Sequence, residues 1–174
     1  RRDAMLSHRA DAVEASACIA ALCALIPVCS SREEAVDAAL DLIDKNSLAY
    51  EAVEVGKKFV NQSASNLHDH YGDMSPVHSL NNLAVVIWAF LSFKDSFDEA
   101  IGETICCGWD TDCTGATVGG LIGLDKGSIP ESWTDPWQGR VNTAIAGVGE
   151  LKLEDLVERT CKLVDQFSSE SDMD

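Results

Sequence analysis

The chain has 174 residues, and 46% of them are hydrophobic, which is enough for one domain with a buried core. Its 13 basic and 29 acidic residues give a net charge of −16, which repels nucleic-acid phosphates and anionic membrane surfaces. We therefore expect no nucleic acid and no membrane among its partners. The seven cysteines include no Cys-x-x-Cys pair, so we expect reduced thiols in an intracellular, cytoplasmic protein.

The first half of the chain has a helical hydrophobic pattern. Residues 11–28 are apolar on most faces, which predicts a buried central helix. Ser31 followed by Glu34 is a capping-box pattern and predicts a helix from there to about residue 45. An amphipathic helix is expected over residues 48–60.

The middle of the chain contains its longest polar interruption, residues 61–77, where we expect a short helix and a loop. His68 and His70 lie two positions apart and cannot share one helix face, so a surface position is expected for both. Residues 78–93 form a strongly apolar segment, predicted to be helical. Ser96 with Glu99 predicts the start of another helix, which should end before Gly108.

The last third is also predicted to be helical, over residues 114–124, 132–146 and 153–167, which completes an all-α fold. Glycines at 115, 119 and 123 share one face of the first of these helices and allow another helix to approach closely. Trp133 and Trp137 are predicted to be core residues. Residues 168–174 are expected to be an acidic flexible tail.

Candidate chemistry concentrates at Asp110-Thr111-Asp112. In a continuous helix, residues two apart point about 200° away from each other, whereas in the turn before a helix both carboxylates can converge. Carboxylates and hydroxyls are hard oxygen ligands that suit Mg²⁺, Mn²⁺ or Ca²⁺. A metal-free helix cap is the alternative. An EF-hand loop is excluded, because its twelfth position should be glutamate and is Leu121.

Residues 108–119 read Gly-Trp-Asp-Thr-Asp-Cys-Thr-Gly-Ala-Thr-Val-Gly and resemble the C-terminal metal motif of the ADP-ribosylglycohydrolase family. Residues 3–8, 76–82 and 129–133 resemble further segments of that family in the same order. The resemblance therefore covers almost the whole chain. It implies that residues 1–167 are the C-terminal half of such a domain, an orthogonal multi-helix bundle whose N-terminal part is absent.

The resemblance also implies a function. Members carry two divalent cations, Mg²⁺ or Mn²⁺, and hydrolyse the glycosidic bond between ADP-ribose and a protein side chain or small leaving group. Carried over by position, Asp110 and Asp112 are metal ligands, with Asp112 bridging the two ions. Cys113 stands where the family supplies a third ligand, usually threonine, and Thr114 stands where asparagine is common. The resemblance further suggests four substrate-binding candidates: Ser7, His8, His78 and Trp109.

Each of these four residues also has a structural explanation. Ser7 and His8 could form a helix cap and a hydrogen-bonded pair, His78 could be a structural histidine at a helix start, and Trp109 could pack in the core.

The family's N-terminal half normally brings an Asp-Asp metal cluster and the acidic residue that handles the proton, and neither precedes Ser7. We therefore expect no catalytic residue within this chain, and no activity without the missing half, supplied in the same or a second chain. Two alternatives stay open: a non-catalytic descendant that binds ADP-ribose or another nucleotide, and a structural helical module.

Overall fold

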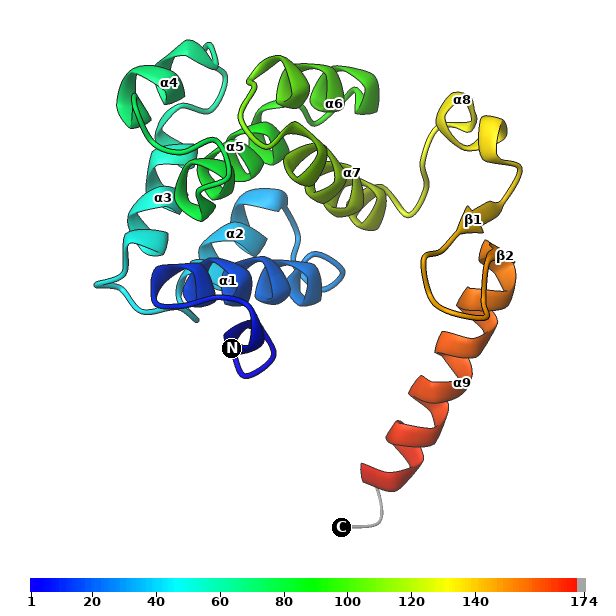
Figure 1. Ribbon diagram of the computed structural model, residues 1–174. Helices are drawn as coiled ribbons and strands as arrows, with labels where there is room; N and C mark the ends of the chain where they lie inside the picture. The colour runs from blue at the N-terminus through cyan, green and yellow to red at the C-terminus, as the bar shows by residue number, and fades with distance from the viewer. Residues whose placement is uncertain (172–174) are drawn as a thin grey trace. The chain divides into compact units, whose positions relative to one another are not determined.

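The computed structural model describes residues 1–171, with side chains as far as residue 167. The described chain is mostly helical, which confirms the all-α prediction apart from one small hairpin. It divides into two compact units, Arg1–Ser128 and Ile129–Asp174 (Figure 1). No described helix is both long enough and apolar enough to cross a membrane.

The first unit begins with a short 3-10 helix and continues with seven α-helices. Ser31 Oγ accepts a hydrogen bond from Glu34 N at 3.1 Å, and Ser96 Oγ accepts one from Glu99 N at 3.1 Å, which confirms both predicted helix starts. The elements are η1 (Ala4–Leu6), α1 (Asp11–Leu25), α2 (Arg32–Leu40), α3 (Leu48–Lys58), α4 (Ser65–Tyr71), α5 (Ser79–Ser92), α6 (Phe97–Cys106) and α7 (Thr111–Lys126).

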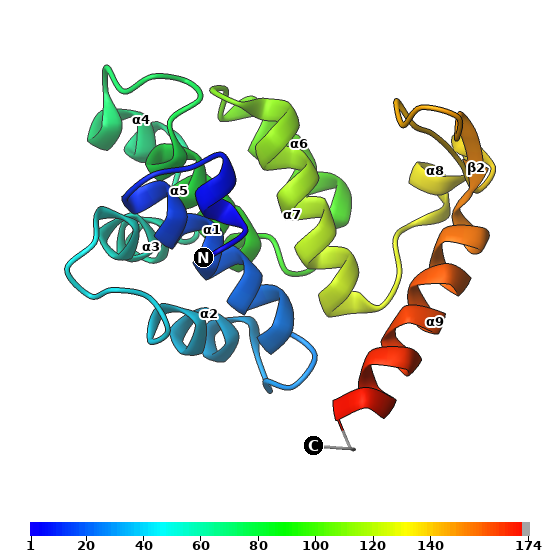
Figure 2. The ribbon, with the colours of Figure 1, turned by 60° about the horizontal axis from the view of Figure 1, so that its bottom comes forward.

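The helix at the centre of this unit is α5, which contacts all six other α-helices of the unit (Figures 1 and 2). Almost every residue from Leu80 to Leu91 is buried. The prediction that residues 11–28 form the buried central helix is therefore wrong in the part of the chain that the structure describes. Ala20, Cys23 and Ala24 are exposed on α1, because the described residues pack against only part of its apolar surface.

Helices α6 and α7 pack closely through two of the predicted glycines. A Cβ atom added to Gly115 would lie 2.9 Å from Ile105 Cδ1, and one added to Gly119 would lie 3.3 Å from Ile101 Cδ1. The absence of a Cβ atom at these two glycines therefore allows the isoleucines of α6 to pack directly against α7.

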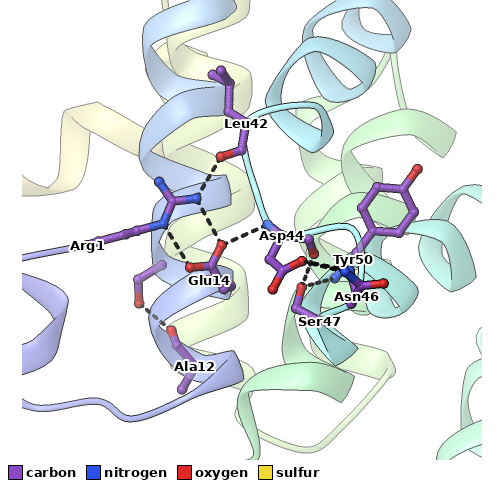
Figure 3. A network of polar contacts seen from close by, with 9 residues as sticks. Arg1, Ala12, Glu14, Leu42, Asp44, Asn46, Ser47 and Tyr50 are labelled. Atoms are coloured by element: carbon purple, nitrogen blue, oxygen red, sulfur yellow. Dashed lines mark hydrogen bonds and ion pairs between the residues drawn. The ribbon is translucent and has the colours of Figure 1, made fainter.

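A polar network joins the start of the chain to α1 and to the α2–α3 loop (Figure 3). Arg1 Nε and Nη2 donate to the two carboxylate oxygens of Glu14 at 2.8 and 2.9 Å, and Nη2 also donates to Leu42 O at 2.6 Å. Glu14 accepts a further hydrogen bond from Asp44 N at 3.0 Å. These contacts fix the loop between α2 and α3 against α1.

The second unit contains two short helical turns, α8 (Glu131–Thr134) and η2 (Asp135–Trp137), then a hairpin and a long helix. Strands β1 (Arg140–Asn142) and β2 (Glu150–Lys152) pair antiparallel, with Val141 opposite Leu151. Helix α9 (Leu153–Ser171) follows directly. It includes residues 168–171 of the expected acidic tail, and residues 172–174 lie outside the described part.

The prediction of a helix over residues 132–146 is wrong. Gln138 and Gly139 adopt left-handed backbone angles, φ +49° and +68°, which end the helical turn and lead the chain into β1. Strands of three residues are too short for alternation to be visible in the sequence. Trp133 and Trp137 are 40% and 38% exposed, so the prediction that they are core residues is also wrong.

Candidate metal centre

The turn between α6 and α7 is formed by two consecutive left-handed residues. Gly108 has φ +75° and Trp109 has φ +60°. Glycine adopts this conformation readily, whereas for a large side chain it costs on the order of 1–3 kcal/mol. The turn ends the α6 helix and places Asp110 at the N-cap position of α7, which begins at Thr111.

Three potential ligand atoms converge at this helix start. One carboxylate oxygen from Asp110, one from Asp112 and the sulfur of Cys113 all lie within 4.8 Å of one another. Asp112 lies in the first turn of α7, not before the helix as expected. The carboxylates nevertheless approach each other, because Asp110 has non-helical angles, φ −88° and ψ 70°, and its side chain makes no capping hydrogen bond.

The chemistry of these donors suits a hard divalent cation only in part. Asp110 is half-buried, while Asp112 and Cys113 are exposed, so both carboxylates are accessible. The Cys113 thiol donates a hydrogen bond to Asp110, and this bond together with the negative charge of Asp110 raises the pKa of Cys113. The thiol therefore stays neutral near pH 7, and a neutral thiol is a poor ligand for Mg²⁺ or Mn²⁺.

The hydroxyl of Thr114, the residue after Cys113, is already hydrogen-bonded to the backbone. Thr114 is 2% exposed, and its Oγ1 donates to the carbonyl oxygen of Asp110 at 2.9 Å.

The other residues singled out by the sequence make separate contacts. Ser7 Oγ and His8 Nδ1 lie 2.7 Å apart, as an exposed hydrogen-bonded pair, but Ser7 does not cap α1, whose N-cap residue is Ala10. His78 is the N-cap residue of α5, where its Nδ1 accepts a hydrogen bond from Leu80 N at 3.3 Å. None of these contacts involves a side chain of the Asp110 cluster.

Trp109 is half-buried and packs against the core. Its indole stacks on the His68 imidazole, with ring centroids 4.0 Å apart and an interplanar angle of 26°. His68 lies on the short helix expected between residues 61 and 77 and is exposed as predicted. Its contact with Trp109 could not be predicted from the sequence, because 41 positions separate the two residues.

An apolar groove of about 400 Å³ opens next to the cluster, between α1, α5 and α7. Its lining includes Cys113 and Thr114 of α7 and Ala20 of α1. Asn82 also lines it, and the buried Oδ1 of that side chain accepts no hydrogen bond from any described residue. The groove therefore offers mostly apolar surface.

The sequence profile of the ADP-ribosylglycohydrolase family matches residues 1–170, so the chain belongs to that family. Comparisons with curated proteins and with solved structures return no significant match. Members of this family often depend on a binuclear metal centre, and their substrates contain ADP-ribose. The largely helical fold agrees with this membership.

Proposed function

We propose that residues 1–167 form the C-terminal half of an ADP-ribosylglycohydrolase domain. In the complete domain, this half contributes metal ligands to an enzyme that hydrolyses the glycosidic bond between ADP-ribose and a protein side chain or a small leaving group. The convergence of Asp110, Asp112 and Cys113 in a chain of this family is the observation that supports the proposal. The free thiols of all seven cysteines favour a cytoplasmic location.

Asp110 and Asp112 are the proposed ligands for Mg²⁺ or Mn²⁺, with Asp112 placed between two ions and Cys113 as a weak third donor. Bound divalent cations supply Lewis-acid stabilisation of the charge that develops as a glycosidic bond loosens. With a net charge of −16, the chain's own field repels a pyrophosphate. The role of the two carboxylates is therefore to hold the positive charge that a substrate containing ADP-ribose requires.

The cluster offers three donors, whereas a single Mg²⁺ takes six ligands in octahedral geometry. We propose that the remaining ligands and the proton-transfer group come from a segment outside residues 1–174, in the same or a second polypeptide. The groove between α1, α5 and α7 is the proposed surface for that segment, because it is mostly apolar and lies beside Cys113. Ser7, His8, His78 and Trp109 remain candidates for contact with the substrate.

The test is an assay of ADP-ribose release from an ADP-ribosylated peptide in the presence of Mn²⁺. The chain alone should release none, and the domain completed with the upstream segment should release it in a cation-dependent manner. Asp112→Asn in the completed domain should abolish the activity, and Asp73→Asn, in the loop before α5, serves as the control. Release by the chain alone would contradict the half-domain proposal.

The same completed domain separates the two alternatives. Calorimetric binding of ADP-ribose without any hydrolysis favours a non-catalytic binding protein. A completed domain that binds neither Mn²⁺ nor ADP-ribose favours a structural helical module.

A further inference from the structure

Helix α4 contacts both neighbours of Gly108, in the turn that leads to Asp110. The imidazole of His68 stacks on the indole of Trp109, one residue after Gly108. Its Nε2 forms a hydrogen bond with the carbonyl oxygen of Cys107, one residue before Gly108. Tyr71, at the end of α4, meets the same indole edge-on, with ring centroids 6.3 Å apart.

These contacts are made to a residue whose backbone conformation is unfavourable. Trp109 has φ +60°, which costs a large side chain free energy that its surroundings must offset. If Trp109 relaxed to a negative φ, the peptide plane that follows would rotate and Asp110 would point in a different direction. Because α6 and α7 are packed against each other, such a change must be compensated at neighbouring dihedral angles. One of these is the non-helical ψ of Asp110, which sets how its carboxylate lies relative to that of Asp112.

We propose that His68 is a positioning residue for the cation site at Asp110 and Asp112. By stacking on Trp109 and bonding to Cys107, it holds the α6–α7 turn in the left-handed form that brings the carboxylates together. The inference rests on the proposed function, because it requires the two aspartates to be cation ligands. His68 itself is not among the potential ligand atoms that converge at this helix start.

His70 provides a matched control on the same helix. Its ring meets Tyr71 and Phe59 edge-on, with centroid distances of 4.8 and 6.4 Å. Both histidines are exposed.

The experiment measures Mn²⁺ binding to the domain completed with the upstream segment, by electron paramagnetic resonance of the free ion. We expect His68→Ala to weaken Mn²⁺ binding roughly tenfold, the usual size of the effect when a residue that orients a ligand is removed. His70→Ala should leave the affinity within about twofold of the parent. His68→Phe keeps an aromatic ring for Trp109 but not the hydrogen bond, and should recover part of the loss.

Amide hydrogen exchange over residues 108–112 gives a second readout that does not depend on the metal. Exchange there should become faster in His68→Ala and stay unchanged in His70→Ala. Equal Mn²⁺ affinity in the parent and in His68→Ala would overturn the positioning role alone. Absence of Mn²⁺ binding in the completed domain without substitutions would instead overturn the cation site, and the inference with it.

Discussion

Arg32 Nη2 lies 2.8 Å from Asp125 Oδ2, in an ion pair where the arginine side chain is only 4% exposed. Through Nη1, the same guanidinium donates to the Phe90 carbonyl oxygen at 2.7 Å, and it lies 4.7 Å from the centroid of the Phe90 ring. Arg32 begins α2, Phe90 belongs to the central helix α5, and Asp125 lies in the last turn of α7. One buried side chain therefore joins three helices.

We expect Asp125→Ala to lower the free energy of unfolding by about 3 kcal/mol, because it leaves the Arg32 guanidinium buried without its counter-ion. Urea denaturation measures the change. Asp41→Ala is the control: its pair with Lys45 has side chains 71% and 66% exposed, and its loss should stay under about 0.5 kcal/mol. Similar losses of stability in the two variants would mean that the burial of Arg32 does not increase the contribution of its ion pair.

Replacement of glycine by alanine should have opposite effects on stability at two helical positions. A Cβ at Gly56 of α3 would lie 2.7 Å from the Ala84 carbonyl oxygen and 2.9 Å from Ile87 Cβ, so the helix backbones must move apart. We expect Gly56→Ala to destabilise the protein by about 2 kcal/mol or more. Nothing lies within 4 Å of the corresponding position on Gly120 of α7, where Gly120→Ala should stabilise by roughly 0.5–1 kcal/mol. Thermal unfolding of both variants tests the sign.

Stability should depend on acid pH through Glu14. The hydrogen bond from Arg1 lowers the pKa of Glu14 from 4.5 to about 2, against a smaller opposing effect of burial, and the bond from Asp44 N acts in the same direction as Arg1. The carboxylate is thus more acidic in the folded chain than in the unfolded chain. Its stabilising contribution is complete above about pH 4.5 and is lost as the pH falls toward 2.

The size of this contribution is about 1 kcal/mol, since the Arg1 side chain is 46% exposed and solvent screens the pair. Glu14→Gln removes this carboxylate alone and so separates its contribution to stability from that of the other carboxyl groups. The variant should be less stable than the parent by that amount near neutral pH, and the difference should vanish near pH 2. A difference that stays constant over this range would rule out the ion pair as its source.

Cys113→Thr should strengthen binding of Mn²⁺ or Mg²⁺ several-fold, because a hydroxyl oxygen is a harder donor than a neutral thiol. Calorimetry or paramagnetic resonance measures the affinity. Cys23→Thr, at an exposed position on α1, should leave it unchanged. A weaker affinity in Cys113→Thr would indicate that the sulfur is itself a preferred ligand, and hence that a softer metal occupies the site.

The features that could be predicted from the sequence are those encoded by neighbouring residues. The caps at Ser31 and Ser96 depend on a residue three positions later, and the approach of Asp110 to Asp112 depends on the turn that contains them. The sequence nevertheless predicts the helix start near Thr114 and not at Thr111, because the local pattern does not reveal that the non-helical angles end at Asp110.

The features that could not be predicted join distant parts of the chain or depend on backbone angles. Arg32 and Asp125 are 93 positions apart, and a lone arginine at a helix start gives no sign of a buried partner. The stack of His68 on Trp109 joins residues 41 positions apart and is also not encoded locally. The hairpin was missed because Gln138, which is not a usual left-handed residue, ends the helical turn before it.

The contact of Gly115 with Ile105, and of Gly119 with Ile101, makes the sequences of α6 and α7 interdependent. Across homologues, a residue larger than glycine at position 115 should occur together with a shorter side chain at position 105, and the same should hold for 119 and 101. Because the Asp110 turn connects these two helices, covariation between the two pairs would preserve its geometry while the individual residues change.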